Sequence, residues 1–134
     1  MLRPVFELRH ATSHVAAVQD ATLHSSWAGL IPEHGLFGSP EWWSAVESGD
    51  IPTHRVSGII SRVYMSGHND YPEFEVTSGS TTTSWTREGD DEAYIPGRAV
   101  TVEYVLQRFK KPLKGVGENS QSVLRILVDD GRGA

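Results

Sequence analysis

The segment 98–109, "RAVTVEYVLQRF", constrains the fold of this chain more than any other stretch. Apolar side chains occupy every second position in it: Val100, Val102, Tyr104 and Leu106. A period of two is the period of a β-strand, in which successive side chains point to opposite faces of a sheet. The chain is therefore expected to contain a sheet with at least one face buried against a core.

Four more segments have strand character. The segment 53–65, "THRVSGIISRVYM", alternates over its whole length and carries apolar residues on both faces. Shorter runs rich in threonine and aromatic residues, which favour strands, follow at 73–77 and 80–87, and a last apolar run spans 122–130. The connection at 66–72 has the glycine, asparagine, aspartate and proline that are typical of turns.

A glycine, Gly58, lies in the middle of the long segment 53–65. Glycine weakens a strand, so its presence there indicates a bulge, a sharp bend or the close approach of another backbone. In a small barrel the first strand has to bend through both halves of the wall, and Gly58 would permit that bend. We therefore predict a mainly β fold with a closed five-stranded barrel over 54–129.

Three patterns in this region have counterparts in a known fold. They are "V-x-G-x-I-x-x-V" at 56–63, "F-x-V" at 74–76 and "YIPGRAVTV" at 94–102. Their arrangement resembles the oligonucleotide/oligosaccharide-binding (OB) fold. That family usually has a helix between its third and fourth strands, whereas here the segment 88–97 is short and acidic and a helix is expected before the barrel instead. An SH3-like barrel is the alternative.

Helices are predicted ahead of the barrel. Ser39 can cap a helix that begins at Pro40, and Gly49 can end it in a left-handed conformation, which together predict a helix at 40–48. Apolar residues at approximately helical spacing predict another at 12–28. The predicted organisation is an N-terminal helical or irregular extension (1–38), a barrel domain with its leading helix (39–130) and a flexible tail (131–134).

Composition narrows the function classes. The chain has no cysteine, which excludes disulfides and thiol chemistry and favours the cytoplasm, and no apolar run predicts an export or membrane segment. Its 12 Lys and Arg against 17 Asp and Glu give 12 − 17 = −5 at neutral pH. Phosphate backbones repel such a domain on average, because nucleic-acid binding rests heavily on cationic side chains.

These features favour a small acidic, non-enzymatic binding module with a protein partner. The predicted contact combines an exposed tryptophan of the 40–48 helix with the acidic loop, and comprises Trp42, Trp43, Asp90, Asp91 and Glu92. A bacterial immunity protein bound to a nuclease toxin, or an adaptor protein, would have this size and charge.

The alternative function is binding of single-stranded nucleic acid or another polyanion. In an OB-like barrel the connection between the last two strands often flanks the ligand, and here that connection is basic. The cations and the aromatic stacking surfaces of this hypothesis are Tyr64, Tyr71, Phe74, Trp85, Arg108, Lys110, Lys111 and Lys114.

Catalytic and metal sites have weaker signals. His68 lies two residues from Asp70 and could act as a general base. His10 and His14 are four residues apart and would share one face of a helix, as zinc ligands sometimes do. Neither pair is accompanied by a catalytic or metal-binding motif, so we expect no enzyme activity, cofactor or metal.

Overall fold

The strands and helices are given by a computed structural model, which describes residues 2–24, 30, 33–65, 72–89, 91–113 and 117–130; at 108–113 and 117–120 it describes the backbone alone. The strands are β1 (Leu2–Glu7), β2 (Thr53–Met65), β3 (Pro72–Ser78), β4 (Thr81–Thr86), β5 (Ala99–Leu113) and β6 (Gly117–Asp129). The helices are α1 (Thr12–His24) and α2 (Pro40–Ser48), with single 3-10 turns η1 (Leu8–His10) and η2 (Asp91–Ala93). The protein is mainly β, as predicted.

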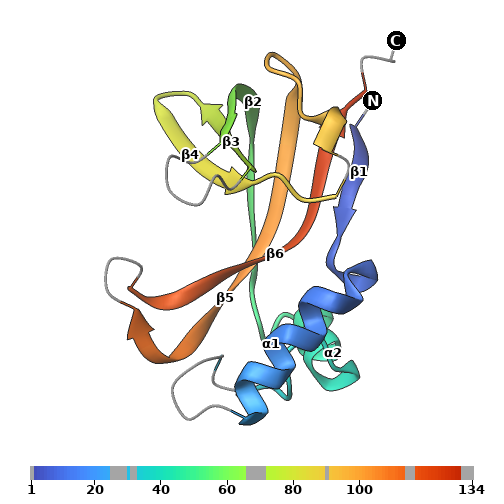
Figure 1. Cartoon of the computed structure of the whole chain (residues 1–134), viewed down its shortest axis with the longest axis vertical. Helices are drawn as coiled ribbons and strands as arrows, with labels where there is room; N and C mark the ends of the chain where they lie inside the picture. Colours follow the sequence, from blue (N-terminus) through green and yellow to red (C-terminus); the bar gives the residue numbers. More distant parts are fainter. Residues whose placement is uncertain are drawn as a thin grey trace. The chain divides into compact units, whose positions relative to one another are not determined.

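The strands form one antiparallel sheet of six, in the order β1-β6-β5-β2-β3-β4 (Figure 1). The sheet is open, so the prediction of a closed five-stranded barrel is wrong. The strand that the prediction omitted is β1, which pairs antiparallel with β6 and forms one edge of the sheet. Its strand signal is weak because Pro4 and two charged residues interrupt the alternation, and proline is tolerated on an edge strand.

Gly58 serves a purpose other than barrel closure. A Cβ atom at this position would collide with the backbone carbonyl of Thr77 on the neighbouring strand β3. The register between β2 and β3 also shifts between Ile60 and Arg62, which marks a bulge in β2. Of the readings that a strand glycine allows, close backbone approach beside a bulge is the one observed.

Helix α2 confirms the prediction from its capping residues. The Ser39 side chain accepts a hydrogen bond from the Trp42 amide, Pro40 is the first helical residue, and Gly49 ends the helix at φ +87°. Both ends are therefore specified by local sequence. Helix α1 begins at the predicted residue and is described as far as His24, and the rest of the predicted range, 25–28, lies outside the described residues.

The chain divides into two compact units, each with its own core. The sheet unit comprises Met1–Glu7, Arg55–Glu103 and Arg125–Ala134, and the helical unit comprises Leu8–His54 and Tyr104–Leu124. The buried apolar residues of the sheet unit include Ile60, Phe74, Val76, Trp85, Tyr94, Val100, Val102, Ile126 and Val128. Those of the helical unit include Leu8, Leu30, Phe37, Trp42, Ala45, Ile51, Val105 and Leu124.

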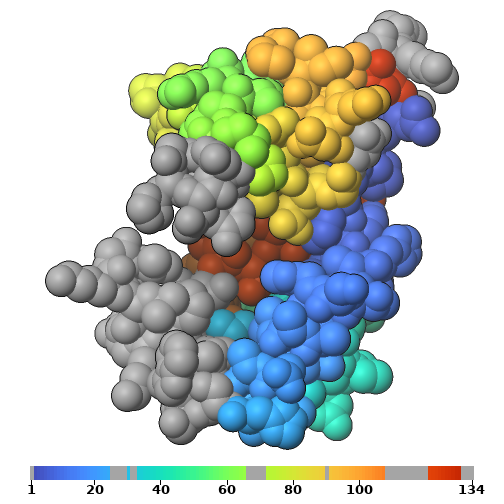
Figure 2. Space-filling view, in the orientation of Figure 1, coloured from blue at the N-terminus to red at the C-terminus, as the bar shows by residue number. Residues whose placement is uncertain are grey.

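Two polar bonds connect helix α1 to the rest of the helical unit. Thr22 is its buried residue, and the Thr22 hydroxyl accepts a hydrogen bond from the Leu30 amide at 3.3 Å. The Gln19 amide donates to the Phe37 carbonyl at 2.8 Å. Most of the helix surface remains accessible to solvent. The helix is part of the blue region on the face that Figure 2 shows.

Candidate protein-binding surface

The acidic loop between β4 and β5 is held in place by bonds within the sheet unit. The Tyr94 hydroxyl donates to the Glu88 carbonyl and accepts from the Glu88 amide, which closes the loop on itself. Gly89, at φ +73°, packs so closely on β1 that a Cβ there would strike the Val5 carbonyl. The Arg87 guanidinium binds the Asp91 carboxylate at 3.0 Å. The loop is thus pre-organised, which lowers the entropy lost when a partner binds it.

This loop forms one side of a groove of about 400 Å³ in the sheet unit. Strand β1, the turn η2 with the residues after it, and the end of β6 supply the lining: Arg3, Pro4, Val5, Glu92, Ala93, Ile95, Arg98, Val128, Asp129 and Asp130. Ile95 is 42% exposed and provides an apolar contact surface beside three carboxylates and two guanidinium groups. Arg3 lies 3.6 Å from Asp130 and partly neutralises it.

The predicted acidic contact residues have different surroundings. Glu92 lines the groove and is exposed. Asp91 is exposed but is paired with Arg87, and Asp90 lies outside the described residues. The groove residues contributed by β1 and by the end of β6 were missed by the sequence reasoning, because β1 itself was not predicted.

The two adjacent tryptophans of α2 also differ. Trp42 is fully buried, its ring packs edge-on against Phe37 and Trp43, and its indole N–H donates to the Gln107 side chain at 3.0 Å. Trp42 therefore offers no surface to a partner. Trp43 is half-buried, and the Arg9 guanidinium lies 3.9 Å from the centre of its ring. Of the two, Trp43 is the one that a partner could reach.

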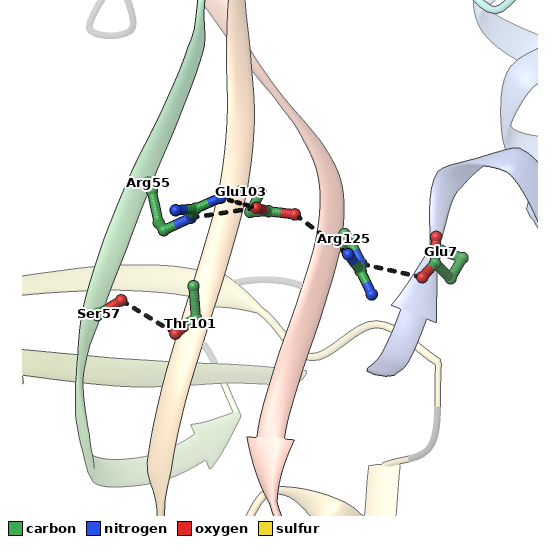
Figure 3. A network of polar contacts seen from close by, with 6 residues as sticks. All are labelled: Glu7, Arg55, Ser57, Thr101, Glu103 and Arg125. Atoms are coloured by element: carbon green, nitrogen blue, oxygen red, sulfur yellow. Dashed lines mark hydrogen bonds and ion pairs between the residues drawn. The ribbon is translucent and has the colours of Figure 1, made fainter. Parts of the chain in front are cut away.

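A row of alternating charges crosses four neighbouring strands of the sheet (Figure 3). Glu103 on β5 binds Arg55 on β2 and lies 3.8 Å from Arg125 on β6, and Arg125 in turn donates to Glu7 on β1 at 3.0 Å. The Ser57 and Thr101 hydroxyls, 3.0 Å apart, continue the polar surface between β2 and β5. Because two carboxylates and two guanidiniums neutralise one another, this row is better suited to joining the strands than to attracting a charged partner.

The residues of the nucleic-acid hypothesis are not assembled into an exposed stacking surface where the structure describes them. Phe74 and Trp85 face each other across β3 and β4 in the core, at 0% and 6% exposure. Tyr64 is half-buried, with the Arg62 guanidinium over its ring. Tyr71 and Lys114, and the side chains of Arg108, Lys110 and Lys111, lie outside the described part of the chain.

The histidine candidates do not form a described site. His10 lies in η1, before α1 begins, whereas the ring of His14 lies edge-on to Phe37, so the two do not share a helix. His68 and Asp70 lie outside the described residues. Among the residues that are described, no group of three or more His, Asp and Glu side chains could hold a metal ion. No helix in the same set is long and apolar enough to span a bilayer.

The sequence was also compared with known proteins. No curated protein matches it. A protein-family model described as "Immunity protein RhsI2" matches residues 3–129, which include every helix and all but one residue of the strands. Because the match covers nearly the whole chain, the protein belongs to the RhsI2 immunity protein family and is a protein-binding module of the immunity type.

Proposed function

We propose that this protein neutralises a protein toxin by binding it stoichiometrically, with the acidic groove of the sheet unit as part of the contact surface. The observation that carries the proposal is the family match over residues 3–129. An immunity protein protects a cell by occupying its toxin, and occupation requires a stable complementary surface rather than a catalytic centre.

The chemistry of the groove supports a partner with a basic surface. The chain carries a net charge of −5, and in the groove around the exposed Ile95 the three carboxylates outnumber the two guanidiniums. An apolar contact bordered by charged groups is the usual anatomy of a protein interface. Charge complementarity would speed association with a basic toxin, and the apolar contact would slow its dissociation.

The direct test is protection of cells. A candidate toxin domain would be expressed in a bacterial host with and without this protein, and growth would be measured. We expect growth only when both are present, and a one-to-one complex of the purified proteins in light scattering coupled to gel filtration. Failure to form a complex, with the toxin active and this protein folded, would refute the proposal.

Two controls make the test specific. A single-stranded oligonucleotide of mixed sequence should leave tryptophan fluorescence unchanged at low salt, where electrostatic binding is strongest. The double variant Glu92→Gln, Asp129→Asn should weaken the toxin complex. Asp20→Asn removes an exposed carboxylate on α1, outside the groove, and should not.

A further inference from the structure

The helical unit has a pocket of its own beyond the C-terminal end of α2. Its volume is about 200 Å³. The described lining consists of Glu33, His34, Asp50, Ile51, Pro52, Leu106 and Gln107. Leu106 is 41% exposed although it is large and apolar, and Ile51 beside it is buried. The pocket therefore combines a solvent-exposed apolar surface with two carboxylates, those of Glu33 and Asp50.

The wall that carries Asp50 is fixed by the end of α2. The Gly49 amide donates to the Val46 carbonyl at 3.3 Å, and the Ile51 amide donates to the Ala45 carbonyl at 3.0 Å. These bonds are those of a left-handed helix cap, which satisfies the last carbonyls of the helix. The chain on either side of Asp50 is thus held before any partner arrives.

Another lining residue, Gln107, is held by the buried tryptophan. Gln107 lines the pocket, and its side-chain oxygen accepts a hydrogen bond from the Trp42 indole at 3.0 Å. Trp42 is fully buried, so this bond cannot shift without disturbing the core of the helical unit. Trp42 accordingly positions a pocket residue from inside the unit.

The electrostatics of the pocket favour a cation. The C-terminal end of a helix carries about half a negative charge, which adds to the charge of Asp50 immediately beyond it. The last turn of α2 has no basic residue. Arg9, the nearby cation bound to Glu47 on α2, also lies over the Trp43 ring. Within the described residues, no side chain bonds to the Asp50 carboxylate, and none that lines the pocket is a lysine or arginine.

We propose that this pocket receives an arginine side chain of the protein partner, an inference that rests on the proposed toxin-binding function for the identity of that partner. The aliphatic part of the arginine would lie along Leu106, Ile51 and Pro52, and the guanidinium would reach the Asp50 and Glu33 carboxylates. Arginine fits better than lysine because its planar fork donates to two acceptors at once and is less strongly hydrated. Arginine is also among the residues enriched at the centres of protein interfaces.

The pocket can be tested without the toxin. The probe is N-acetyl-arginine methylamide, titrated against the full chain while the methyl resonances of Ile51 and Leu106 are followed by NMR; Ile51→Val and Leu106→Val assign the signals. The matched control is the citrulline analogue, which has the same shape without the charge. We expect saturable shifts with a dissociation constant on the order of 1–10 mM, at least about tenfold weaker for citrulline.

Variants then identify the carboxylates. The double variant Glu33→Gln, Asp50→Asn should bind the arginine probe about tenfold or more weakly than the unaltered protein. Asp20→Asn, on α1 of the same unit, should bind it with unchanged affinity. Both variants are checked for folding by their unfolding temperature. Equal affinity for arginine and citrulline, a stronger response to the lysine analogue, or no saturable shift at Ile51 and Leu106 would each overturn the proposal.

The toxin complex separates this inference from the proposed function. If the unaltered protein binds the toxin and Asp50→Asn weakens binding about tenfold, both stand. If the toxin binds the variant and the unaltered protein equally, the pocket is not part of the contact and only the further inference fails. If no toxin complex forms at all, the proposed function fails, and with it the identification of the partner, whereas the probe titration still decides whether the pocket binds arginine.

Discussion

Two acidic side chains, one in each unit, have opposite surroundings. In the sheet unit, Glu103 has a side chain only 13% exposed and lies between two arginines on the neighbouring strands. In the helical unit, Asp50 stands exposed beyond the end of a helix, with no described side chain bonded to its carboxylate. Each is a single carboxylate, and the two differ in whether a described side chain supplies a counter-charge.

This difference indicates which carboxylates stabilise the fold and which are available to bind a partner. A carboxylate neutralised within the sheet joins strands and contributes to the free energy of folding. A carboxylate placed against the negative end of a helix dipole works against folding, by a small amount. This loss of folding stability is small, and a cationic group of a bound partner can offset it by pairing with the carboxylate. The predictions below test this separation, beginning with the variant that should have the largest effect.

Trp42→Ala should lower the free energy of unfolding by about 3–5 kcal/mol, because it removes a fully buried aromatic side chain and leaves a cavity. Denaturant titration with a global fit measures this. Trp43→Ala is the matched comparison, and since Trp43 is half-buried the loss should be clearly smaller. Similar losses for the two would contradict the assignment of Trp42 to the core and Trp43 to the surface.

Glu103→Gln should lower the free energy of unfolding by about 1–2 kcal/mol, because Arg55 and Arg125 both lose a charged acceptor. The loss should diminish in high salt, which screens the remaining charges. The comparison variant is Glu7→Gln, at the end of the row, which removes the partner of Arg125 alone within the row and should cost less. An equal cost for both would mean that the row does not act as a connected network.

The parts of the fold that sequence reasoning predicted are those with local signals. Ser39, Pro40 and Gly49 specify α2 by contacts within a few residues, and the helix was predicted with its observed ends. Strand β1 pairs with β6, which is more than a hundred residues away in the sequence. Pro4 interrupts the alternation of apolar and polar residues in β1 that would have indicated a strand. The open sheet followed from that long-range pairing, which no local pattern encodes.

The candidate surfaces were predicted only in part for the same reason. Glu92 was identified because it belongs to a visible acidic run, but Arg3 and Asp130 complete the groove from the two ends of the chain. Asp50 and Leu106, which line the pocket of the helical unit, are likewise distant in sequence. The charge row had a signal that could have been used, since Arg55, Glu103 and Arg125 are charged residues inside three of the predicted strand segments.

Glu92→Gln should slow association with the toxin by about two- to threefold and leave dissociation nearly unchanged, because an exposed charge at the edge of an interface acts mainly on the encounter rate. Surface plasmon resonance at two salt concentrations measures both rates. The effect should shrink at high salt. A change confined to the dissociation rate would instead place Glu92 in the tightly packed centre of the contact.

The smallest effect, and the sharpest test of the comparison, is on the stability of Asp50→Asn. Because this change removes a negative charge from the C-terminal end of α2, it should raise the free energy of unfolding by about 0.3–0.5 kcal/mol at low salt and by less at high salt. Thermal unfolding at low ionic strength, with Asp20→Asn as the comparison, resolves the sign. A destabilisation as large as that of Glu103→Gln would mean that Asp50 is neutralised within the chain. Asp50→Asn is the variant for which we expect higher folding stability together with weaker toxin binding. If it instead destabilised the fold, the distinction between carboxylates that stabilise the fold and carboxylates that bind a partner would not hold.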